Sequence, residues 1–374
     1  MEYFDIPVVM IVYRRLDLTK QVFSRIREVR PKELYIIADG PRSESEKEAV
    51  QSVRDYIDSH IDWDCNVHRN YATENYGLRY RMPSGTDWVF ETADKAIFLE
   101  DDVYPTLSFF SFCREMLLQY ENDEDIMMIS GTNLYPGDGS FGDYDITFSY
   151  FATIWGWATW KRAWEKYDVN IRRWPQVRRS GEIKDIFTKK GYRFYATVFN
   201  DLQYHWYRTW DYQWEFAKFV NHGLGIVPRV NLIRNLGMGN ADGEHANDTK
   251  DKIDFVSGVE VMEMPHPIRC PEQAKRNEEY DILFQNSFVP HVSNYVYLKN
   301  AMRAKVYERL FHQIKKMEQD EVYFSTVLPE EYKLTPRELQ LNPGDRFAFK
   351  DAKSFRKVAF AYWLHRCFHW NILK

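Results

Sequence analysis

Along the first part of the chain, short apolar runs alternate with amphipathic segments. Apolar residues recur at helical spacing between the runs, as at Leu18, Val22 and Ile26. Alternation of strand and helix requires crossover connections, so we expect an α/β fold with a mostly parallel sheet flanked by helices. The runs that predict five buried strands lie at 7–13, 33–39, 64–68, 95–99 and 126–130.

Local signals place the helices between these strands. Ser43 and Glu46 form an S-x-x-E pattern, which predicts a capping box at the start of the second helix. A third helix is expected near 87–91, and Pro105 is expected to open a helix that runs to about Tyr120.

The rest of the chain changes in character. Residues 147–225 are rich in tryptophan and tyrosine, and 223–236 predicts a strand and a turn. The stretch 237–251 is polar and rich in glycine, so we interpret it as a flexible loop. The longest predicted helix is 295–316. We therefore expect a catalytic α/β domain at 1–265 and a mainly helical accessory segment at 266–374.

Composition narrows the class of protein. The 374 residues include 44% hydrophobic and 28% charged residues, which is typical of a globular chain of one large domain with an appendage, or of two domains. The formal net charge of −5 argues against a nucleic-acid partner. Four dispersed cysteines, no secretory signal and no long apolar stretch predict a cytoplasmic protein that is at most peripheral at the inner face of a membrane.

Polar residues follow several of the predicted strands. In parallel sheets, ligands bind beyond the carboxyl ends of the strands, so these residues are candidates for a functional site. They are Arg14, Arg15, Asp39, the segment 75–81, and Glu100, Asp101 and Asp102.

The triplet Glu100, Asp101 and Asp102 is the sharpest of these signals. Adjacent carboxylates repel one another unless a cation offsets their charge, and hard divalent ions prefer oxygen ligands. The triplet therefore predicts a Mn²⁺ or Mg²⁺ site that also holds phosphate oxygens. A solvated acidic turn is the alternative interpretation. The chain has neither a G-x-x-x-x-G-K-[ST] loop nor a G-x-G-x-x-G after the first strand, which leaves enzymes that release a nucleotide diphosphate.

Five segments resemble the GT-A nucleotide-sugar glycosyltransferases, a Rossmann-like fold. The resemblance is to the N-acetylglucosaminyltransferases that begin N-glycan branching and to bacterial relatives that build surface polysaccharide, and it covers roughly 7–250. The segments are IFLEDDVYPTLSFF at 97–110, ADGPR at 38–42, ENYGLRYRMPSGTDWVFE at 74–91, IWGWATWKRAW at 154–164 and WDYQW at 210–214. The chain departs from the family at Arg14, where the family carries an acidic residue, and after about 265.

The resemblance implies roles on the side of the sugar donor. Arg15, and less directly Arg14, would contact the nucleotide, and Asp39 would bind the uracil N–H. Asp102 would contact the metal, Asp101 the ribose or sugar hydroxyls, and Glu100 the sugar. Arg79 and Arg81 would bind the nucleotide or its diphosphate, and the loop residue His245 the diphosphate or the metal. A plain turn residue is the alternative for Asp39, and surface ion pairs are the alternative for the arginines.

The resemblance also implies roles on the acceptor side. Asp211 would be the general base of an inverting transfer, in which one carboxylate takes the proton of the acceptor hydroxyl. Glu215 lies nearby as a substitute, and Trp155 and Trp157 would stack on acceptor sugars. The alternatives are a structural Asp211 and core tryptophans.

The predicted function is thus a metal-dependent hexosyltransferase reaction. The donor would be a UDP-sugar, with N-acetylglucosamine suggested by the resemblance, and the acceptor a hydroxyl of a glycan or a lipid-linked glycan. A nucleotidyltransferase that makes sugar nucleotides is a rival, weakened because no glycine-rich loop follows the first strand. A catalytically silent glycan-binding module on the same fold is another.

The C-terminal segment suggests a further partner. Residues 350–374 carry six basic and one acidic side chain, and Phe360, Trp363, Leu364, Cys367 and Phe368 follow helical spacing. This helix would either rest on anionic lipid or dock on its own domain.

Overall fold

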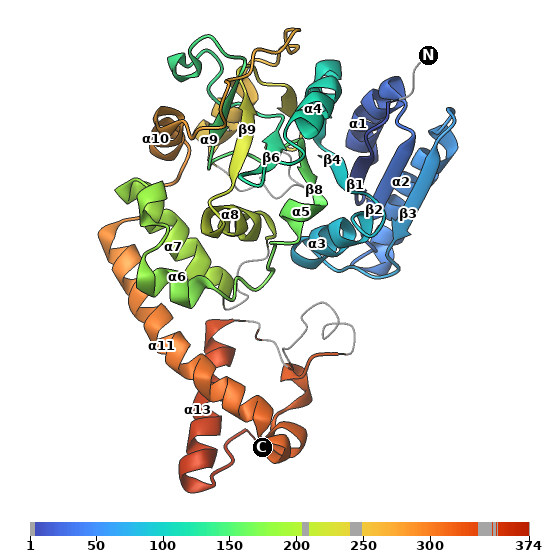
Figure 1. Cartoon of the computed structure of the whole chain (residues 1–374). Coiled ribbons are helices and arrows are strands. Elements are labelled where there is room, and N and C mark those ends of the chain that lie inside the picture. The colour runs from blue at the N-terminus through green and yellow to red at the C-terminus, as the bar shows by residue number, and fades with distance from the viewer. Residues whose placement is uncertain are drawn as a thin grey trace. The chain divides into compact units, whose positions relative to one another are not determined.

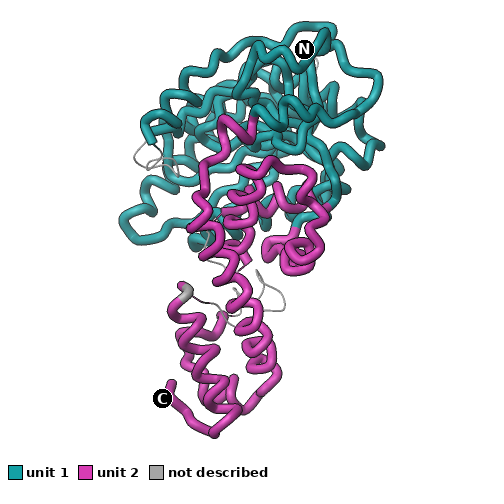
Figure 2. Tube along the Cα trace, turned by 90° about the vertical axis from the view of Figure 1, so that its left-hand side faces the viewer, with its two compact units in different colours: residues 1–167, 221–283 teal, residues 168–220, 284–374 magenta. Residues whose placement is uncertain are grey.

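The chain divides into two compact units, which Figure 2 shows in teal and magenta. Unit 1 comprises Met1–Tyr167 and Asn221–Leu283, and unit 2 comprises Asp168–Val220 and Phe284–Lys374. The computed structural model describes residues 4–203, 209–239, 249–335, 346, 349 and 351–373. The predicted division at residue 265 does not follow these units, because the segment 168–220 groups with the C-terminal helices.

Unit 1 is built around an eight-stranded sheet with the order β3-β2-β1-β4-β8-β6-β9-β7 (Figure 1). Its strands are β1 (Val8–Val12), β2 (Glu33–Ala38), β3 (Asn66–Tyr71), β4 (Lys95–Glu100), β6 (Ile126–Ser130), β7 (Ile146–Ser149), β8 (Trp157–Trp160) and β9 (Leu224–Pro228). A two-stranded sheet pairs β5 (Val103–Pro105) with β10 (Ile233–Asn235).

The first four strands in the sheet order are all parallel. β1 lies at the centre of this group: Val8 pairs with Leu34 of β2 and with Ile97 of β4. Nearly the whole of β1 and β2 is buried, whereas β3 at the edge is half exposed. This explains why β1, β2 and β4 are continuous apolar runs, while the run for β3 is weaker.

The other half of the sheet is mixed. β8 runs antiparallel between β4 and β6, and β7 runs antiparallel beside β9. β6 and β9 are parallel, so four of the pairings are parallel and three are antiparallel. The prediction of an α/β fold with a mostly parallel sheet flanked by helices is confirmed.

The helices of unit 1 are α1 (Leu16–Val29), α2 (Lys47–His60), α3 (Leu78–Val89), α4 (Leu107–Gln119), α5 (Lys161–Trp164) and α9 (Lys250–Gly258). The first two follow the predicted apolar spacing, whereas the third, expected near 87–91, spans Leu78–Val89, and α5 and α9 were not predicted. Pro105 belongs to β5, so α4 begins two residues after it. The predicted capping box is wrong: Ser43 makes no capping bond, and α2 begins only at Lys47, after a short 3₁₀ turn at Glu44–Glu46.

Unit 2 is helical. It contains α6 (Trp174–Ser180), α7 (Lys189–Gln203), α8 (Asp211–Val220), α11 (Asn294–Gln319) and α13 (Ala352–Phe368), and α10 (Glu278–Ser287) spans the boundary between the units. Buried polar groups tie α6 and α7 to α11. Asn200 Nδ2 donates to Asn300 Oδ1 at 2.6 Å, and Arg178 Nη2 lies 2.6 Å from Glu308 Oε2. The mainly helical C-terminal region is confirmed.

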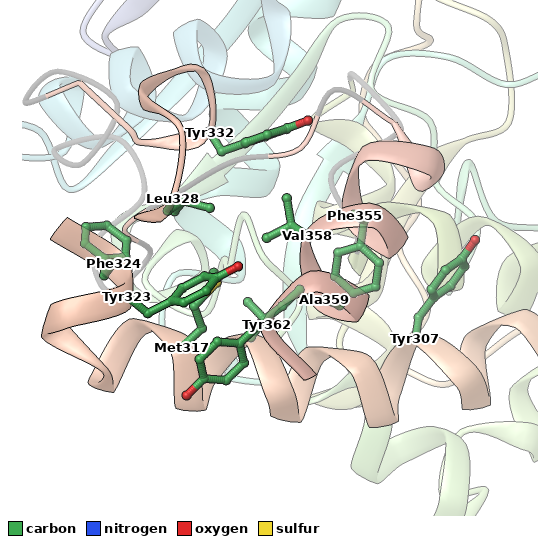
Figure 3. Close-up of a cluster of buried hydrophobic side chains, with 11 residues drawn as sticks. Tyr307, Met317, Tyr323, Phe324, Leu328, Tyr332, Phe355, Val358, Ala359 and Tyr362 are labelled. Carbon is green, nitrogen blue, oxygen red and sulfur yellow. The ribbon is translucent and has the colours of Figure 1, made fainter. Parts of the chain in front are cut away.

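An apolar cluster of buried side chains lies within unit 2 (Figure 3). It joins α11, α13 and the turns between them through buried side chains that include Tyr307, Met317, Phe355, Val358 and Tyr362. α13 is therefore anchored to its own unit through one face. Among the described residues, no helix combines the length and the apolar character that crossing a membrane needs.

Candidate active site

The strand order places the predicted polar residues at a topological switch point. Within the sheet, β2 and β3 lie on one side of β1, and the chain then returns to place β4 on the other side of β1. A crevice forms beyond the carboxyl ends of parallel strands where the order reverses, and ligands bind there. Arg15 follows β1, and Asp101 and Asp102 follow β4.

Arg15 joins the two aspartates at this point. Its Nε lies 3.3 Å from Asp101 Oδ2, its Nη2 donates to Asp101 Oδ1, and its Nη1 lies 2.9 Å from Asp102 Oδ2. The guanidinium therefore forms a fork with Asp101 and reaches Asp102 with its remaining nitrogen. The sequence signals at 14–15 and 100–102 are two parts of one cluster.

Burial and charge act against each other in this cluster. The Asp101 side chain is 5% exposed and that of Asp102 is 14% exposed. Burial raises the pKa of Asp101 to about 6, although Arg15 acts in the opposite direction, so this carboxyl is mostly ionised at neutral pH. Burial also opposes the charge on Arg15, but Asp101 and Asp102 outweigh it and raise the pKa of Arg15. Two carboxylates and one guanidinium leave a net negative charge.

The backbone of Gly237 approaches Asp102 closely. β5 pairs with β10, and the Leu236 N–H donates to the Asp102 carbonyl at 2.7 Å. A Cβ atom on Gly237 would lie 2.0 Å from Asp102 Oδ2. Gly237 thus leaves room for the carboxylate in its present position.

Replacing Gly237 with alanine is expected to move Asp102 away from Arg15. The added methyl overpacks the site, which typically costs about 1–3 kcal/mol, and it should weaken donor binding about tenfold or more. Donor binding by calorimetry and thermal unfolding measure the two effects. Gly139→Ala is the matched control, because nothing lies within 4 Å of a Cβ there. Unchanged donor binding in Gly237→Ala would contradict a role for Asp102.

Arg14 is part of a neighbouring cluster. Its Nη1 lies 3.3 Å from Glu46 Oε1, and Glu46 also accepts bonds from the Tyr13 hydroxyl and from the Arg42 N–H. The hydrogen bond from Tyr13 is the main reason that the pKa of Glu46 is lowered. This explains the failed capping box, since the Glu46 side chain is held by Tyr13 and Arg14, which follow β1, and by Arg42, which follows β2.

Asp39 organises the backbone beyond β2. Its Oδ1 accepts the N–H groups of Gly40 at 2.9 Å and of Tyr76 at 2.8 Å, and its Oδ2 accepts that of Gly77 at 3.0 Å. These bonds hold the loop that leads into α3. Asp39 therefore has a structural role here, and a contact with uracil stays a prediction.

Arg79 and Arg81 lie on α3 and are both buried. Arg81 Nη2 donates to the carbonyls of Ala38, at 3.2 Å, and of Asn70, so it binds β2 and β3 together at their ends. Burial lowers the pKa of Arg81. Its hydrogen bonds go to the protein's own backbone and to Asn70 Oδ1, and a contact of either arginine with a nucleotide stays a prediction.

The remaining candidates in unit 1 differ in exposure. Glu100 ends β4 opposite Ile11 and is partly exposed, as is Trp155. Trp157 is 1% exposed and its ring stacks on Phe98 with centroids 4.6 Å apart. The expectation that Trp157 stacks on an acceptor sugar is not supported by this position, because β8 places its ring in the core.

Unit 2 carries the candidates for the general base. Asp211 is the first residue of α8, where the helix dipole favours a negative charge, and its Oδ1 accepts a hydrogen bond from the Thr209 hydroxyl. Glu215 lies one turn later, and its Oε1 is 3.1 Å from Nζ of the fully buried Lys218. Glu215 therefore serves as the counter-ion of a buried lysine.

One predicted ligand of the metal lies in a part of the chain that the structure does not describe. His245 falls outside the described residues. Within the described residues no group of three or more His, Cys, Asp and Glu side chains is arranged to hold a metal. The sequence predicted no role for Gly237 or Lys218 and assigned Glu46 to a capping box; the glycine-rich stretch that begins at 237 was the one signal for Gly237.

Three solved structures resemble part of this chain in their backbone fold. No family model matches the chain, and no curated protein matches it. The mannosyltransferase PcManGT from Pyrobaculum calidifontis, solved with GDP-Man and Mn²⁺, is 14% identical with a TM-score of 0.33; the match covers 45% of this chain and 49% of that one. TarS 1–349 from S. aureus is 11% identical with a TM-score of 0.36, over 67% of this chain and 69% of that one.

A third solved structure also matches in part. HddC from Yersinia pseudotuberculosis is 12% identical with a TM-score of 0.24, and the match covers 33% of this chain and 57% of that one. This chain thus spans about half the length of the mannosyltransferase. Because these TM-scores are low, the function proposed below rests on the chain's own residues.

Proposed function

We propose that this protein is a glycosyltransferase that moves a sugar from a nucleotide diphosphate sugar to a hydroxyl of a glycan or a lipid-linked glycan. The observation that carries the proposal is the Arg15–Asp101–Asp102 cluster at the switch point between β1 and β4. It combines a cation for phosphate with carboxylates for hydroxyls where such sheets bind their ligands.

The donor-side roles follow the chemistry of each group. Arg15 binds Asp101 with its fork, and the remaining N–H groups of its Nη1 and Nη2 suit the diphosphate, with Arg14 beside it. Asp101 accepts hydrogen bonds from ribose or sugar hydroxyls, and Glu100 from the sugar. UDP is the nucleotide and N-acetylglucosamine the sugar that the sequence resemblance suggests.

A divalent cation fits this cluster through Asp102. Its carboxylate is the more exposed of the pair, and Mg²⁺ or Mn²⁺ is commonly held by one or two carboxylates together with substrate phosphates and water. When bound, such an ion offsets charge on the departing nucleotide diphosphate. A site of this kind needs no cluster of three protein ligands.

Asp211 is proposed as the general base on the acceptor side. An inverting transfer needs one carboxylate that takes the proton of the attacking hydroxyl. Its place at the start of α8 puts it where the helix dipole favours a negative charge, and the neighbouring rings of Trp210 and Trp214 are buried and hold the helix in place. Glu215 is less suited, because its partner is the buried Lys218. Trp155 is the remaining candidate for contact with an acceptor sugar.

Nucleotide-sugar binding tests the proposal directly. Thermal unfolding would be followed with UDP-, GDP-, CMP- and dTDP-sugars, each with and without Mn²⁺. A ligand that binds only the folded chain stabilises it by about 2.7 kcal/mol at a hundredfold excess over its Kd. We expect a UDP-sugar with Mn²⁺ to give the largest shift, and Mn²⁺ alone a smaller one.

Product analysis then separates the reaction classes. A glycosyltransferase releases UDP from the donor in the presence of an acceptor, whereas a nucleotidyltransferase releases pyrophosphate from UTP and a sugar phosphate. Binding without Mn²⁺-dependent release of UDP would favour the silent binding module. The absence of any shift with all four donor classes would overturn the proposed function.

A further inference from the structure

The C-terminal helix α13 is apolar on two different faces. One face, which includes Phe355, Val358, Ala359 and Tyr362, is buried in the cluster of unit 2 (Figure 3). These positions follow an i, i+3, i+4, i+7 spacing, so they account fully for the docking of the helix on its own unit. The apolar pattern predicted from the sequence, at 360, 363, 364, 367 and 368, lies on another face.

That other face points to solvent. Phe360 is 54% exposed and Trp363 is 43% exposed, and their rings stack with centroids 5.8 Å apart. The row of rings continues past the end of the helix, from Trp363 to Phe368 at 6.1 Å and from Phe368 to Trp370 at 5.5 Å. Ile372 is also exposed. We call Phe360, Trp363, Phe368, Trp370 and Ile372 the aromatic row.

Basic side chains accompany the aromatic row. Lys353, Arg356 and Lys357 are exposed on the first turns of α13, and at 100° per residue their positions fall on the same side of the helix as Phe360. Arg366 is exposed near its end. Asp351 is the sole acidic residue of the described stretch 351–373, and its carboxylate caps the helix by accepting the N–H groups of Lys353 and Ser354. The face is therefore positively charged, in a chain whose formal net charge is −5.

We propose that the aromatic row and the basic residues Lys353, Arg356 and Lys357 bind the surface of a membrane that contains anionic lipids. Helices that lie in the membrane interface combine aromatic and apolar side chains on one side with Lys and Arg around them. Tryptophan rings sit at the headgroup level, and each basic residue near an anionic surface contributes about 1 kcal/mol. A protein partner would need an acidic surface to match this charge. A membrane with anionic lipids already carries the negative charge in its headgroups.

The inference does not rest on the proposed function. Both apolar faces of α13 and its charges are independent of the cluster in unit 1, and lipid binding is measured without donor or acceptor. If the enzyme activity fails while vesicle binding holds, the membrane surface stands by itself. If both hold, lipid-linked glycans are the first acceptors to assay.

Vesicle co-sedimentation of the full chain tests the proposal. We expect the protein to pellet with vesicles of three parts phosphatidylcholine to one part phosphatidylglycerol, and not with phosphatidylcholine alone. Raising the salt concentration should weaken the pelleting. Tryptophan emission should shift to the blue on the anionic vesicles, and Trp363→Phe/Trp370→Phe should lose that shift while still pelleting.

Matched variants locate the surface. Phe360→Ser/Trp363→Ser and Lys353→Glu/Lys357→Glu are each expected to weaken vesicle binding about tenfold or more. Leu118→Ser/Tyr144→Ser and Lys20→Glu/Lys32→Glu make the same kinds of change at exposed positions of unit 1 and should leave binding unchanged. Thermal unfolding confirms that each variant is folded.

Two outcomes would overturn the proposal. An exposed apolar stripe on α11, which includes Leu298, Met302 and Val306, gives an internal comparison. If Leu298→Ser/Met302→Ser loses vesicle binding while the α13 variants keep it, the membrane contact belongs to α11 and not to α13. Self-association that depends on Trp363, with no binding to anionic vesicles, would show that the aromatic row pairs two copies of the chain.

Discussion

Asp211→Asn is expected to lower the rate of sugar transfer by about 10² to 10⁴-fold while donor binding stays unchanged. A positioned general base contributes a factor of this size, and asparagine keeps the shape of the side chain but cannot accept a proton. The Thr209 hydroxyl can still donate to the remaining amide oxygen, so the start of α8 should stay folded. Steady-state release of UDP and donor titration by calorimetry give the two quantities.

Control variants on the same helix make this result specific. Tyr212→Phe changes the next residue of α8 and should retain activity. Glu215→Gln removes the counter-ion of the buried Lys218, which typically costs about 3–5 kcal/mol, so its main effect should be on thermal unfolding. Full activity in Asp211→Asn would remove this residue from the mechanism, and a folded but inactive Glu215→Gln would transfer the role to Glu215.

Arg15→Met should impair both stability and donor binding. The substitution leaves the buried Asp101 without its forked partner, and breaking a buried ion pair in this way costs about 3 kcal/mol or more. It also removes the cation proposed to meet the diphosphate. We expect an easily detectable drop in unfolding temperature and loss of measurable nucleotide-sugar binding.

Arg14→Met provides the matched comparison one residue away. Arg14 is more exposed, and its pair with Glu46 is longer, at 3.3 Å, so its loss should cost about 1 kcal/mol or less. Arg15→Lys keeps the charge but not the fork and should fall between the two methionine variants. Equal effects of Arg14→Met and Arg15→Met on donor binding would argue against the cluster as the centre of the site.

Four strands of the sheet could be predicted from sequence because each is almost wholly buried. β1, β2, β4 and β6 all appear as continuous apolar runs. β8 could not be predicted: its four residues, Trp157–Trp160, lie within an aromatic-rich stretch, and its place between β4 and β6 is fixed only by pairing with strands distant in sequence. Alternation along the chain carries no information about an antiparallel strand inserted between two crossover units.

The site shows the same division between local and distant information. Arg15 and Asp101 were expected at one edge because the carboxyl ends of adjacent parallel strands meet there, and the structure joins them. The partners of Asp39 were not foreseen, since the N–H groups of Tyr76 and Gly77 come from a loop far along the chain. Glu46 had the spacing of a capping residue, but the Tyr13 hydroxyl holds its carboxylate instead.

Because the segments of the two units alternate along the chain, they constrain the order in which the units can fold during synthesis on the ribosome. α6 and α7 emerge early and bond to each other through Arg178 and Asn200, yet the partners of Asn200 Nδ2 and Arg178 Nη2 belong to α11, which begins at Asn294. At typical elongation speeds of about 5–20 residues per second, the nascent α7 waits on the order of ten seconds for that partner. During this interval its apolar and amide surfaces are open to chaperones, so unit 2 completes its fold only after the strands of unit 1 have all been made.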